Sequence, residues 1–211
     1  MIERLDRVIA SRPDRPQVGN ADHPMRKVTR QIAFEADGWN AERKAKVAAL
    51  FDDLAVGWND RFTAEESWQP IDDVFARGGQ LTGPCLEIGA GTGLATIRIA
   101  TKFEHVTAID VSLEMLRRFG EPSSSPVLSD GAVLPIADGS IGTLVAVNAF
   151  LFPCEYDRVL APGGAIVWIN SLGENTPIHL PIDDVIAAMP GRWDAITSEA
   201  GWGLWGVLRR A

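Results

Sequence analysis

Residues 86–96 read LEIGAGTGLAT, a short stretch that combines one acidic residue with three closely spaced glycines. Glu87 lies inside an apolar run typical of a buried strand, and Gly89, Gly91 and Gly93 follow it at once. A strand that enters a helix through such a turn lets the backbone approach a ligand closely, because no Cβ intervenes and a positive φ is tolerated. The stretch therefore predicts a turn that holds a nucleoside cofactor.

The spacing of the glycines separates two kinds of nucleoside site. The dinucleotide fingerprint GxGxxG would place its third glycine at position 94, where this chain has Leu94. The observed spacing is GxGxG, and together with the in-strand Glu87 it resembles the first motif of the class I S-adenosylmethionine-dependent methyltransferases. A glycine turn alone is weak evidence, so the motifs that follow it matter.

Three further motifs follow in the order that this family has. HVTAID ends at Asp110, about 20 residues past the turn, where a carboxylate at a strand's end can accept hydrogen bonds from both ribose hydroxyls. PVLSDGAVLPIADGSIGTLVAVNAF resembles the family's third and fourth strands. DRVLAPGGAIVWIN resembles its turn into the fifth strand, with Ala161 where lysine is usual. The resemblance spans residues 84–211.

The resemblance implies a role for each residue around the cofactor. Asp110 would bind the ribose, Val111 would pack on the adenine face, and Asp130 would bind the adenine amino group. Glu87 would act indirectly, by bonding the amides of the glycine turn or the methionine ammonium. The implied cofactor-binding residues are Glu87, Gly89, Ala90, Gly91, Gly93, Asp110, Val111, Asp130, Gly131, Asn148 and Phe150.

Each of the three carboxylates also has a purely structural interpretation. Asp110 could cap the helix that follows it, and Asp130 could be a turn residue before Gly131. Glu87 could pair with a buried arginine. The sequence leaves these alternatives open.

In the family, a methyl group passes in line from a sulfonium to a nucleophile. Holding donor and acceptor in a dry pocket can carry most of the catalysis, and a base is optional. Asn148 and Phe150 match family positions near the methyl group, and Asn148 could contribute one hydrogen bond. His179, after the fifth predicted strand, is a weak candidate for a base. His23 lies in the N-terminal arm, and His105 is expected at the surface.

The composition argues against several other functions. Lys and Arg number 20 against 28 Asp and Glu, which gives a net charge of −8 that would repel nucleic acid. No apolar run approaches the roughly 20 residues that span a bilayer, and the N-terminus has no secretory pattern, so we expect a cytoplasmic location. Cys85 and Cys154 lack metal-binding spacing, and we expect neither zinc nor a disulfide.

The sequence also predicts the main strands and helices that carry these residues. After residue 84, short runs rich in Val and Ile alternate with amphipathic segments, which predicts βαβ units and a parallel sheet covered on both faces. Helical spacing dominates residues 25–77, and residues 1–22 are expected to form one short helix and an irregular arm. WDAITSEA and GLWGVLRRA predict an antiparallel hairpin at the edge of the sheet.

We therefore expect an α/β, Rossmann-like fold with seven mostly parallel strands, an antiparallel C-terminal hairpin and helices on both faces. Residues 1–80 would form an N-terminal helical region that covers the site, and residues 81–211 the cofactor-binding core, within one compact domain. Trp39, Trp58 and Trp68 fall in this N-terminal region and could line an acceptor pocket or belong to the core.

The expected function is methyl transfer from S-adenosylmethionine to a small-molecule acceptor at O, N or C. One alternative is a methyltransferase-like module that binds the cofactor, or nothing, without catalysis and acts as a scaffold. Another is a nucleotide-dependent oxidoreductase, against which Leu94 argues. The sequence predicts neither the acceptor nor the oligomeric state.

Overall fold

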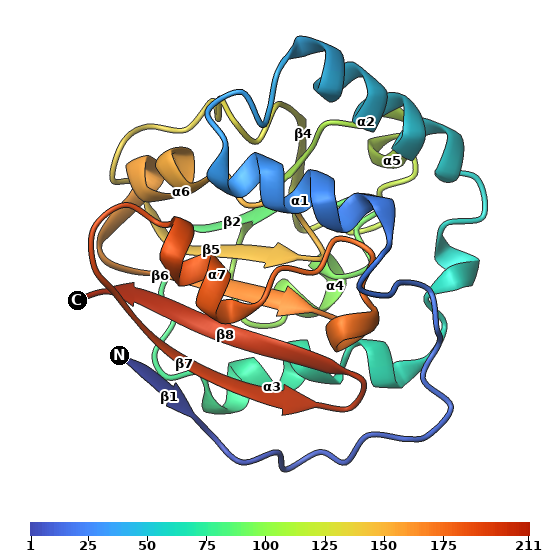
Figure 1. The fold of residues 1–211 in the computed structure, drawn as a ribbon. Coiled ribbons are helices and arrows are strands. Elements are labelled where there is room, and N and C mark those ends of the chain that lie inside the picture. The colour runs from blue at the N-terminus through green and yellow to red at the C-terminus, as the bar shows by residue number, and fades with distance from the viewer.

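One eight-stranded sheet with helices on both faces forms the centre of the protein, in a computed structural model that describes residues 1–211 (Figure 1). The strand order is β1-β7-β8-β6-β5-β2-β3-β4, and only β8 runs antiparallel to its neighbours β6 and β7. The strands are β1 (Ile2–Arg4), β2 (Cys85–Ile88), β3 (Val106–Asp110), β4 (Ser125–Leu128), β5 (Ile141–Val147), β6 (Leu160–Asn170), β7 (Trp193–Ala200) and β8 (Gly203–Arg210).

Seven α-helices and three short 3-10 helices connect or cover these strands. Side chains cap the two longest helices: His23 Nδ1 accepts from the Met25 amide, and Asn40 Oδ1 accepts from the Arg43 amide. The helices are α1 (Pro24–Phe34), α2 (Ala41–Leu54), η1 (Asn59–Arg61), η2 (Glu65–Ser67), α3 (Gln69–Arg77), α4 (Thr96–Ile99), α5 (Leu113–Leu116), α6 (Pro153–Val159), η3 (Gly173–Asn175) and α7 (Ile182–Ala188).

The core has two halves, one on each face of the sheet. Successive side chains of a strand point to opposite faces, so Leu144 of β5 packs in one half and Val145 in the other. Helices α6 and α7 contribute to the first half, and α3 and α4 to the second. Every residue of β5 is buried, as expected for a parallel strand covered on both faces.

The α/β architecture expected from the sequence is confirmed. The five strand segments predicted between residues 84 and 171 are β2 to β6, and the two C-terminal segments form the antiparallel hairpin β7–β8. Strand β8 is the reversed strand, inserted between β6 and β7. This arrangement brings the ends of β2, β3, β5 and β6 close together, with the residues that follow each strand at one edge of the sheet.

The prediction for residues 1–22 is wrong in one respect. The segment contains no helix and instead starts with β1, which adds an eighth strand by pairing in parallel with β7. The hairpin is therefore not the edge of the sheet. The physical reason is that β7 would otherwise present unpaired backbone groups, which a short polar segment can pair with although it has no periodic pattern of its own.

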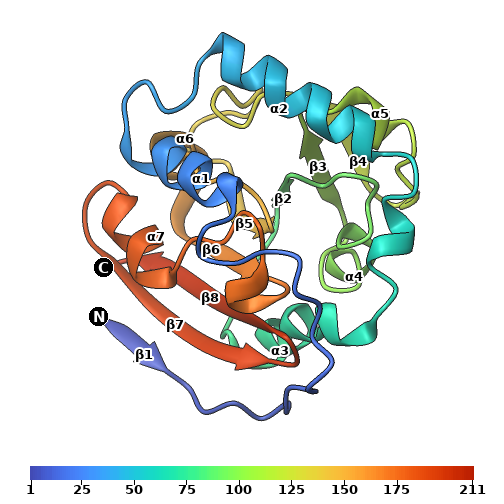
Figure 2. The same cartoon turned by 45° about the vertical axis from the view of Figure 1, so that its right-hand side comes forward.

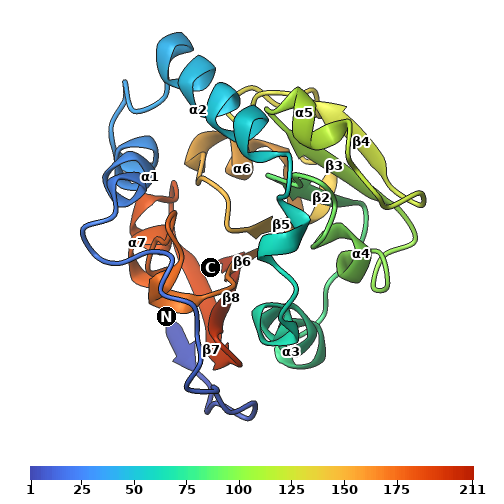
Figure 3. The same ribbon diagram turned by 90° about the vertical axis from the view of Figure 1, so that its right-hand side faces the viewer.

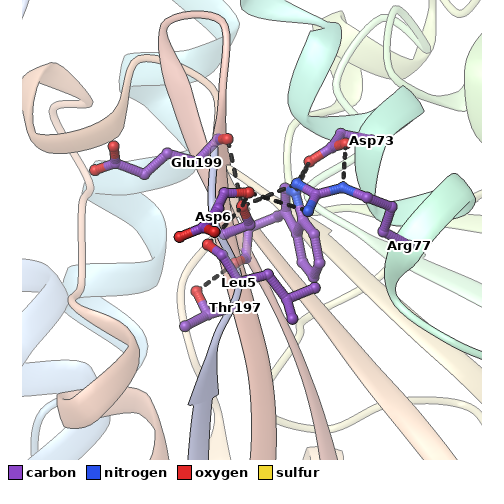
Figure 4. Close-up of polar contacts among 8 residues, drawn as sticks. Leu5, Asp6, Asp73, Arg77, Thr197 and Glu199 are labelled. Carbon is purple, nitrogen blue, oxygen red and sulfur yellow. Dashed lines mark hydrogen bonds and ion pairs between the residues drawn. The ribbon is translucent and has the colours of Figure 1, made fainter. Parts of the chain in front are cut away.

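Side chains from α3 hold the N-terminal strand in place (Figure 4). The Leu5 amide donates to the Thr197 carbonyl at 2.8 Å, which continues the pairing beyond β1. Arg77 Nη1 donates to the Asp6 carbonyl at 3.1 Å, while Arg77 Nε donates to Asp73 Oδ1 at 2.8 Å. The beginning of the chain is thus fixed to both the sheet and a helix that covers it.

Residues 24–68, which we call the lid segment, comprise α1, α2, η1 and η2. Helix α2 lies beside α5, and α1 lies beside α7 (Figures 2 and 3). Two parts of residues 1–80 instead pack with the core: β1 in the sheet, and α3 against β8. None of the helices has the length and apolar character needed to cross a membrane.

Candidate active site

A cavity of about 680 Å³ opens where the lid segment meets the ends of the central strands. This volume falls within the range of sites for small molecules and cofactors. Of the 39 residues that line it, 25 are hydrophobic, so most of its wall is apolar. The polar groups that interrupt this wall are few, and they decide which ligand fits.

The glycine turn, residues 89–93, contributes Gly89, Ala90 and Gly91 to the cavity wall. Gly89, Gly91 and Gly93 have φ values of +74°, +57° and +86°, a region that side chains disfavour. A Cβ on Gly91 would lie 3.8 Å from Trp58 Nε1 and 3.9 Å from Met115 Sδ, and would narrow the cavity. Gly93 does not line the cavity; a Cβ there would lie 3.0 Å from the Phe119 ring.

Asp110, at the end of β3, is the one carboxylate on the cavity wall. Its Oδ2 accepts from the Gly91 amide and its Oδ1 from the Ser112 amide, both at 2.8 Å. Burial raises the pKa of Asp110, and the amides of Ser112 and Gly91 oppose this shift. The carboxylate thus fixes the glycine turn to β3 and also helps to cap α5.

These residues fit a nucleoside. A carboxylate offers about four lone-pair directions, and Asp110 uses one on each oxygen for a backbone amide. One direction on each oxygen remains for a ribose hydroxyl. Ala90 and Val111 also line the cavity, which offers the sugar and base an apolar surface.

Glu87 lies behind the glycine turn and does not line the cavity. Thr96 Oγ1 donates to Glu87 Oε2 at 2.6 Å, which ties β2 to the start of α4. Burial, together with the charge of Asp110, raises the pKa of Glu87 to about 8 despite the Thr96 hydrogen bond. The structure contains no ion pair between Glu87 and an arginine.

Asp130 faces the lid segment rather than the cavity. Its Oδ1 accepts from Trp39 Nε1 and from the Ala132 amide, both at 2.9 Å, and its Oδ2 lies 3.3 Å from Lys44 Nζ. Both oxygens therefore have partners, and an adenine amino group would have to share them. The neighbour Gly131 does line the cavity.

The absence of a side chain at Gly131 has a packing reason. A Cβ there would come within 2.6 Å of Cε2 of the Phe152 ring. Phe152 and Phe150 both line the cavity and both pack against Trp39, Phe152 edge-to-face and Phe150 tilted, with ring centroids 5.3 and 5.9 Å away. Gly131 thus lets one aromatic wall form.

Asn148 lines the cavity in an unusual backbone conformation. It has φ +50°, the only positive φ of a residue other than glycine in this chain. Its Nδ2 donates to Ser171 Oγ and its Oδ1 accepts from the Ser171 amide, both at 2.8 Å. The side chain joins the ends of β5 and β6, so support of the strand ends is the role that the contacts show.

The three histidines lie in different settings. His179 is buried and is not part of the cavity wall, and burial together with the charge of Arg26 lowers its pKa to about 4. His105 is exposed, and its Nε2 lies 3.1 Å from Ser125 Oγ. His23 does line the cavity, but its Nδ1 is used to cap α1. Neither candidate catalytic residue, His179 or Asn148, therefore offers a free basic group to the cavity.

The lid segment supplies a second aromatic wall. Rings of Phe51, Trp58, Phe62 and Trp68 follow one another with centroids 5.9, 5.1 and 6.1 Å apart. Trp39, Trp58 and Trp68, noted in the sequence for their position, all line the cavity. Sequence reasoning missed Phe62, Met115 and Arg61, because no local pattern distinguishes them from surface or core residues.

Hydrogen bonds join the lid segment to the segments around the glycine turn and Asp110. Thr92 Oγ1 donates to Asn59 Oδ1 of η1 at 2.6 Å. Asp52 of α2 accepts from Ser112 Oγ at 2.6 Å and from the Glu114 amide at 3.0 Å. The lid therefore contacts the residues on both sides of the predicted ribose site.

Comparison with known proteins agrees with this geometry. Residues 86–168 match the family model described as a methyltransferase domain. The chain is 34% identical over 105 residues to the biotin biosynthesis bifunctional protein of Cellvibrio japonicus, covering 45% of this chain and 21% of that one. It is 30% identical over 142 residues to the demethylmenaquinone methyltransferase of Renibacterium salmoninarum, covering 60% of this chain and 59% of that one.

The fold is also found among solved structures. The complex of DhpI with SAH superposes with a TM-score of 0.63 at 16% identity, covering 78% of this chain and 95% of that one. The curated relatives are matched over a fifth to three fifths of their own lengths, so they do not by themselves define what the whole protein does. Residues 86–168 therefore match the methyltransferase domain family, and the chain as a whole has the Rossmann-like fold of S-adenosylmethionine-dependent methyltransferases.

Proposed function

We propose that this protein transfers a methyl group from S-adenosylmethionine to a small, largely apolar acceptor. The observation that carries the proposal is one cavity that joins the glycine turn, the Asp110 carboxylate and two aromatic walls. When bound, S-adenosylmethionine supplies a methyl group on a sulfonium that a nucleophile can attack.

The residues of this chain would perform three tasks. Asp110 would orient the ribose, while Ala90, Val111 and Gly131 would bound the space for the base. Gly89 and Gly91 would let the cofactor approach the backbone. The lid segment would exclude water, because its aromatic side chains form much of the remaining wall.

Catalysis in this site would rest on position rather than on a base. Asn148 is bonded to Ser171, His23 uses Nδ1 to cap α1, and His179 is not part of the cavity wall, so these contacts identify no catalytic base. An acceptor that is already ionised, or that is a soft nucleophile, needs no proton removed before it attacks. Held in line and away from water, such a group can react by proximity alone.

The acceptor is expected to be small because of the available space. The cavity volume of about 680 Å³ must hold both reactants. The name of one relative specifies demethylmenaquinone, a small molecule, as its acceptor, which supports this class without defining the compound. The net charge of −8 opposes a nucleic acid acceptor.

Calorimetric titration tests the proposal against the oxidoreductase alternative. We expect S-adenosylhomocysteine to bind with a dissociation constant in the micromolar range and NADH not to bind at the same concentrations. Binding of NADH without binding of S-adenosylhomocysteine would overturn the proposal. Transfer of a labelled methyl group from S-adenosylmethionine to an apolar acceptor would then separate an enzyme from a module that only binds.

A further inference from the structure

Few residues on the cavity wall can carry charge. They are Asp110, at the predicted ribose site, together with Arg61 and His23. Arg61 is therefore the one side chain on this wall that is always positively charged. An arginine at the edge of an apolar cavity attracts an anionic group of the ligand.

Arg61 has no partner of its own within the protein. The guanidinium groups of only three arginines, Arg15, Arg61 and Arg192, form neither a hydrogen bond nor an ion pair in the structure, and only Arg61 lines the cavity. Its Cζ instead lies 5.9 Å from the centre of the Trp58 ring. Such a contact leaves the N–H donors of Arg61 available to a ligand.

The position of Arg61 is fixed relative to the glycine turn. Arg61 ends η1, and η1 begins with Asn59, which accepts the Thr92 hydroxyl at 2.6 Å. Trp58, directly before η1, places Nε1 3.8 Å from the Cβ position of Gly91. The hydrogen bond between Asn59 and Thr92, and the closeness of Trp58 to Gly91, thus place η1 and Arg61 next to the segment that would bind the cofactor.

We propose that Arg61 binds the α-carboxylate of S-adenosylmethionine, an inference that rests on the proposed function. Asp110 would hold the ribose, and Arg61 would hold the amino-acid end of the same molecule. The lid segment would then complete the cofactor site as well as cover the acceptor. A planar guanidinium can donate two parallel hydrogen bonds to a carboxylate.

An acidic acceptor is the other source of a carboxylate for Arg61. The contacts with Thr92 and near Gly91 favour the cofactor, because both belong to the glycine turn. Removing the carboxylate from the cofactor alone distinguishes the two sources. Decarboxylated S-adenosylmethionine differs from S-adenosylmethionine in that group and keeps the nucleoside, the sulfonium and the amine.

Calorimetry with these two compounds and two variants tests the inference. Arg61→Gln removes the charge at the cavity, and Arg192→Gln removes an exposed arginine outside it. We expect Arg61→Gln to raise the Kd of S-adenosylmethionine by about 10- to 100-fold, the effect of losing a charged hydrogen-bond partner. Arg192→Gln should bind like the wild type.

The decarboxylated compound makes the test specific. The wild type should bind it about 10- to 100-fold more weakly than S-adenosylmethionine, and Arg61→Gln should bind both compounds equally well. An unchanged Kd of S-adenosylmethionine in Arg61→Gln would overturn the inference and leave Arg61 to an acidic acceptor. If the wild type bound neither compound, the proposed function itself would fail.

Discussion

At the scale of single residues, Glu87 gives the molecule a predicted dependence on pH. Its folded-state pKa of about 8 lies above the ordinary value of 4.5, so the folded protein binds this proton more tightly than the unfolded chain. The stability that Glu87 contributes is therefore complete below about pH 4.5 and is lost as the pH rises through 8. The loss should be a few kcal/mol in order of magnitude.

Glu87→Gln removes this ionisation but keeps an oxygen that can accept the Thr96 hydroxyl. We expect the variant to be more stable than the wild type at pH 8.5 and similar to it at pH 5, in denaturant unfolding at both values. Glu104→Gln controls for the loss of a carboxylate at an exposed position. If the free energy of unfolding depended on pH in the same way in the wild type and in Glu87→Gln, burial would not raise the pKa of Glu87 as stated.

Residues of this site could be predicted from the sequence only where a pattern of neighbouring residues marks them. Gly89, Gly91 and Asp110 could be predicted because a tight turn and a strand end leave a pattern within about 20 residues. Arg61 could not, because its importance depends on which wall it reaches after folding. The lid contacts of Asp130 were equally hidden, since its partners Trp39 and Lys44 are far away in the chain.

At the scale of elements, Asp52 joins α2 to the start of α5. The Ser112 hydroxyl and the Glu114 amide hold the pKa of this carboxyl below its usual value. Asp52→Ala leaves both donors without this acceptor, and we expect a loss of about 1 kcal/mol in the free energy of unfolding. Hydrogen exchange at the Glu114 amide should become faster.

The neighbouring Asp53 offers a matched control for this contact. It is exposed on the same helix, and its side chain forms no hydrogen bond or ion pair in the structure. Urea unfolding of Asp53→Ala should match the wild type. Equal losses in Asp52→Ala and Asp53→Ala would show that the contact with α5 contributes nothing to stability.

Helices and strands could be predicted where their residues follow a regular hydrophobic pattern. They could not be predicted where they form only by pairing with another strand. Strands β2 to β6 were visible as Val- and Ile-rich runs, and the hairpin as two runs separated by Gly201 and Trp202. Strand β1 has three residues, and it forms because β7 offers it unpaired backbone groups. Such pairing depends on distant residues, which a local pattern does not contain.

At the scale of the whole molecule, Asp73 connects the first and last strands through α3. It is 4% exposed and accepts from Trp205 Nε1 at 2.6 Å and from Arg77, which in turn binds the Asp6 carbonyl (Figure 4). Asp73→Ala would leave the Trp205 N–H without its acceptor and Arg77 without its carboxylate partner. Breaking a buried pair in this way should cost roughly 3 kcal/mol or more.

Hydrogen exchange would show whether the loss spreads to the N-terminal strand. We expect the Leu5 amide, which bonds to Thr197, to exchange faster in Asp73→Ala than in the wild type. The control is Asp72→Ala, which removes a half-exposed partner of Arg98 and should cost less than about 1 kcal/mol. Equal exchange of the Leu5 amide and equal losses of stability in the two variants would show that Asp73 does not connect α3 to the N-terminal strand.

If Asp110 and the glycine turn bind the nucleoside of S-adenosylmethionine, as proposed, the affinity for the cofactor depends on the charge of Asp110. Calorimetry should give a Kd for S-adenosylhomocysteine that rises at least about tenfold in Asp110→Asn, because Asn lacks the charge that strengthens hydrogen bonds from the ribose. Asp138→Asn, at an exposed position outside the cavity, should bind like the wild type. An Asp110→Asn variant that folds and binds S-adenosylhomocysteine as tightly as the wild type would show that Asp110 does not bind the ribose.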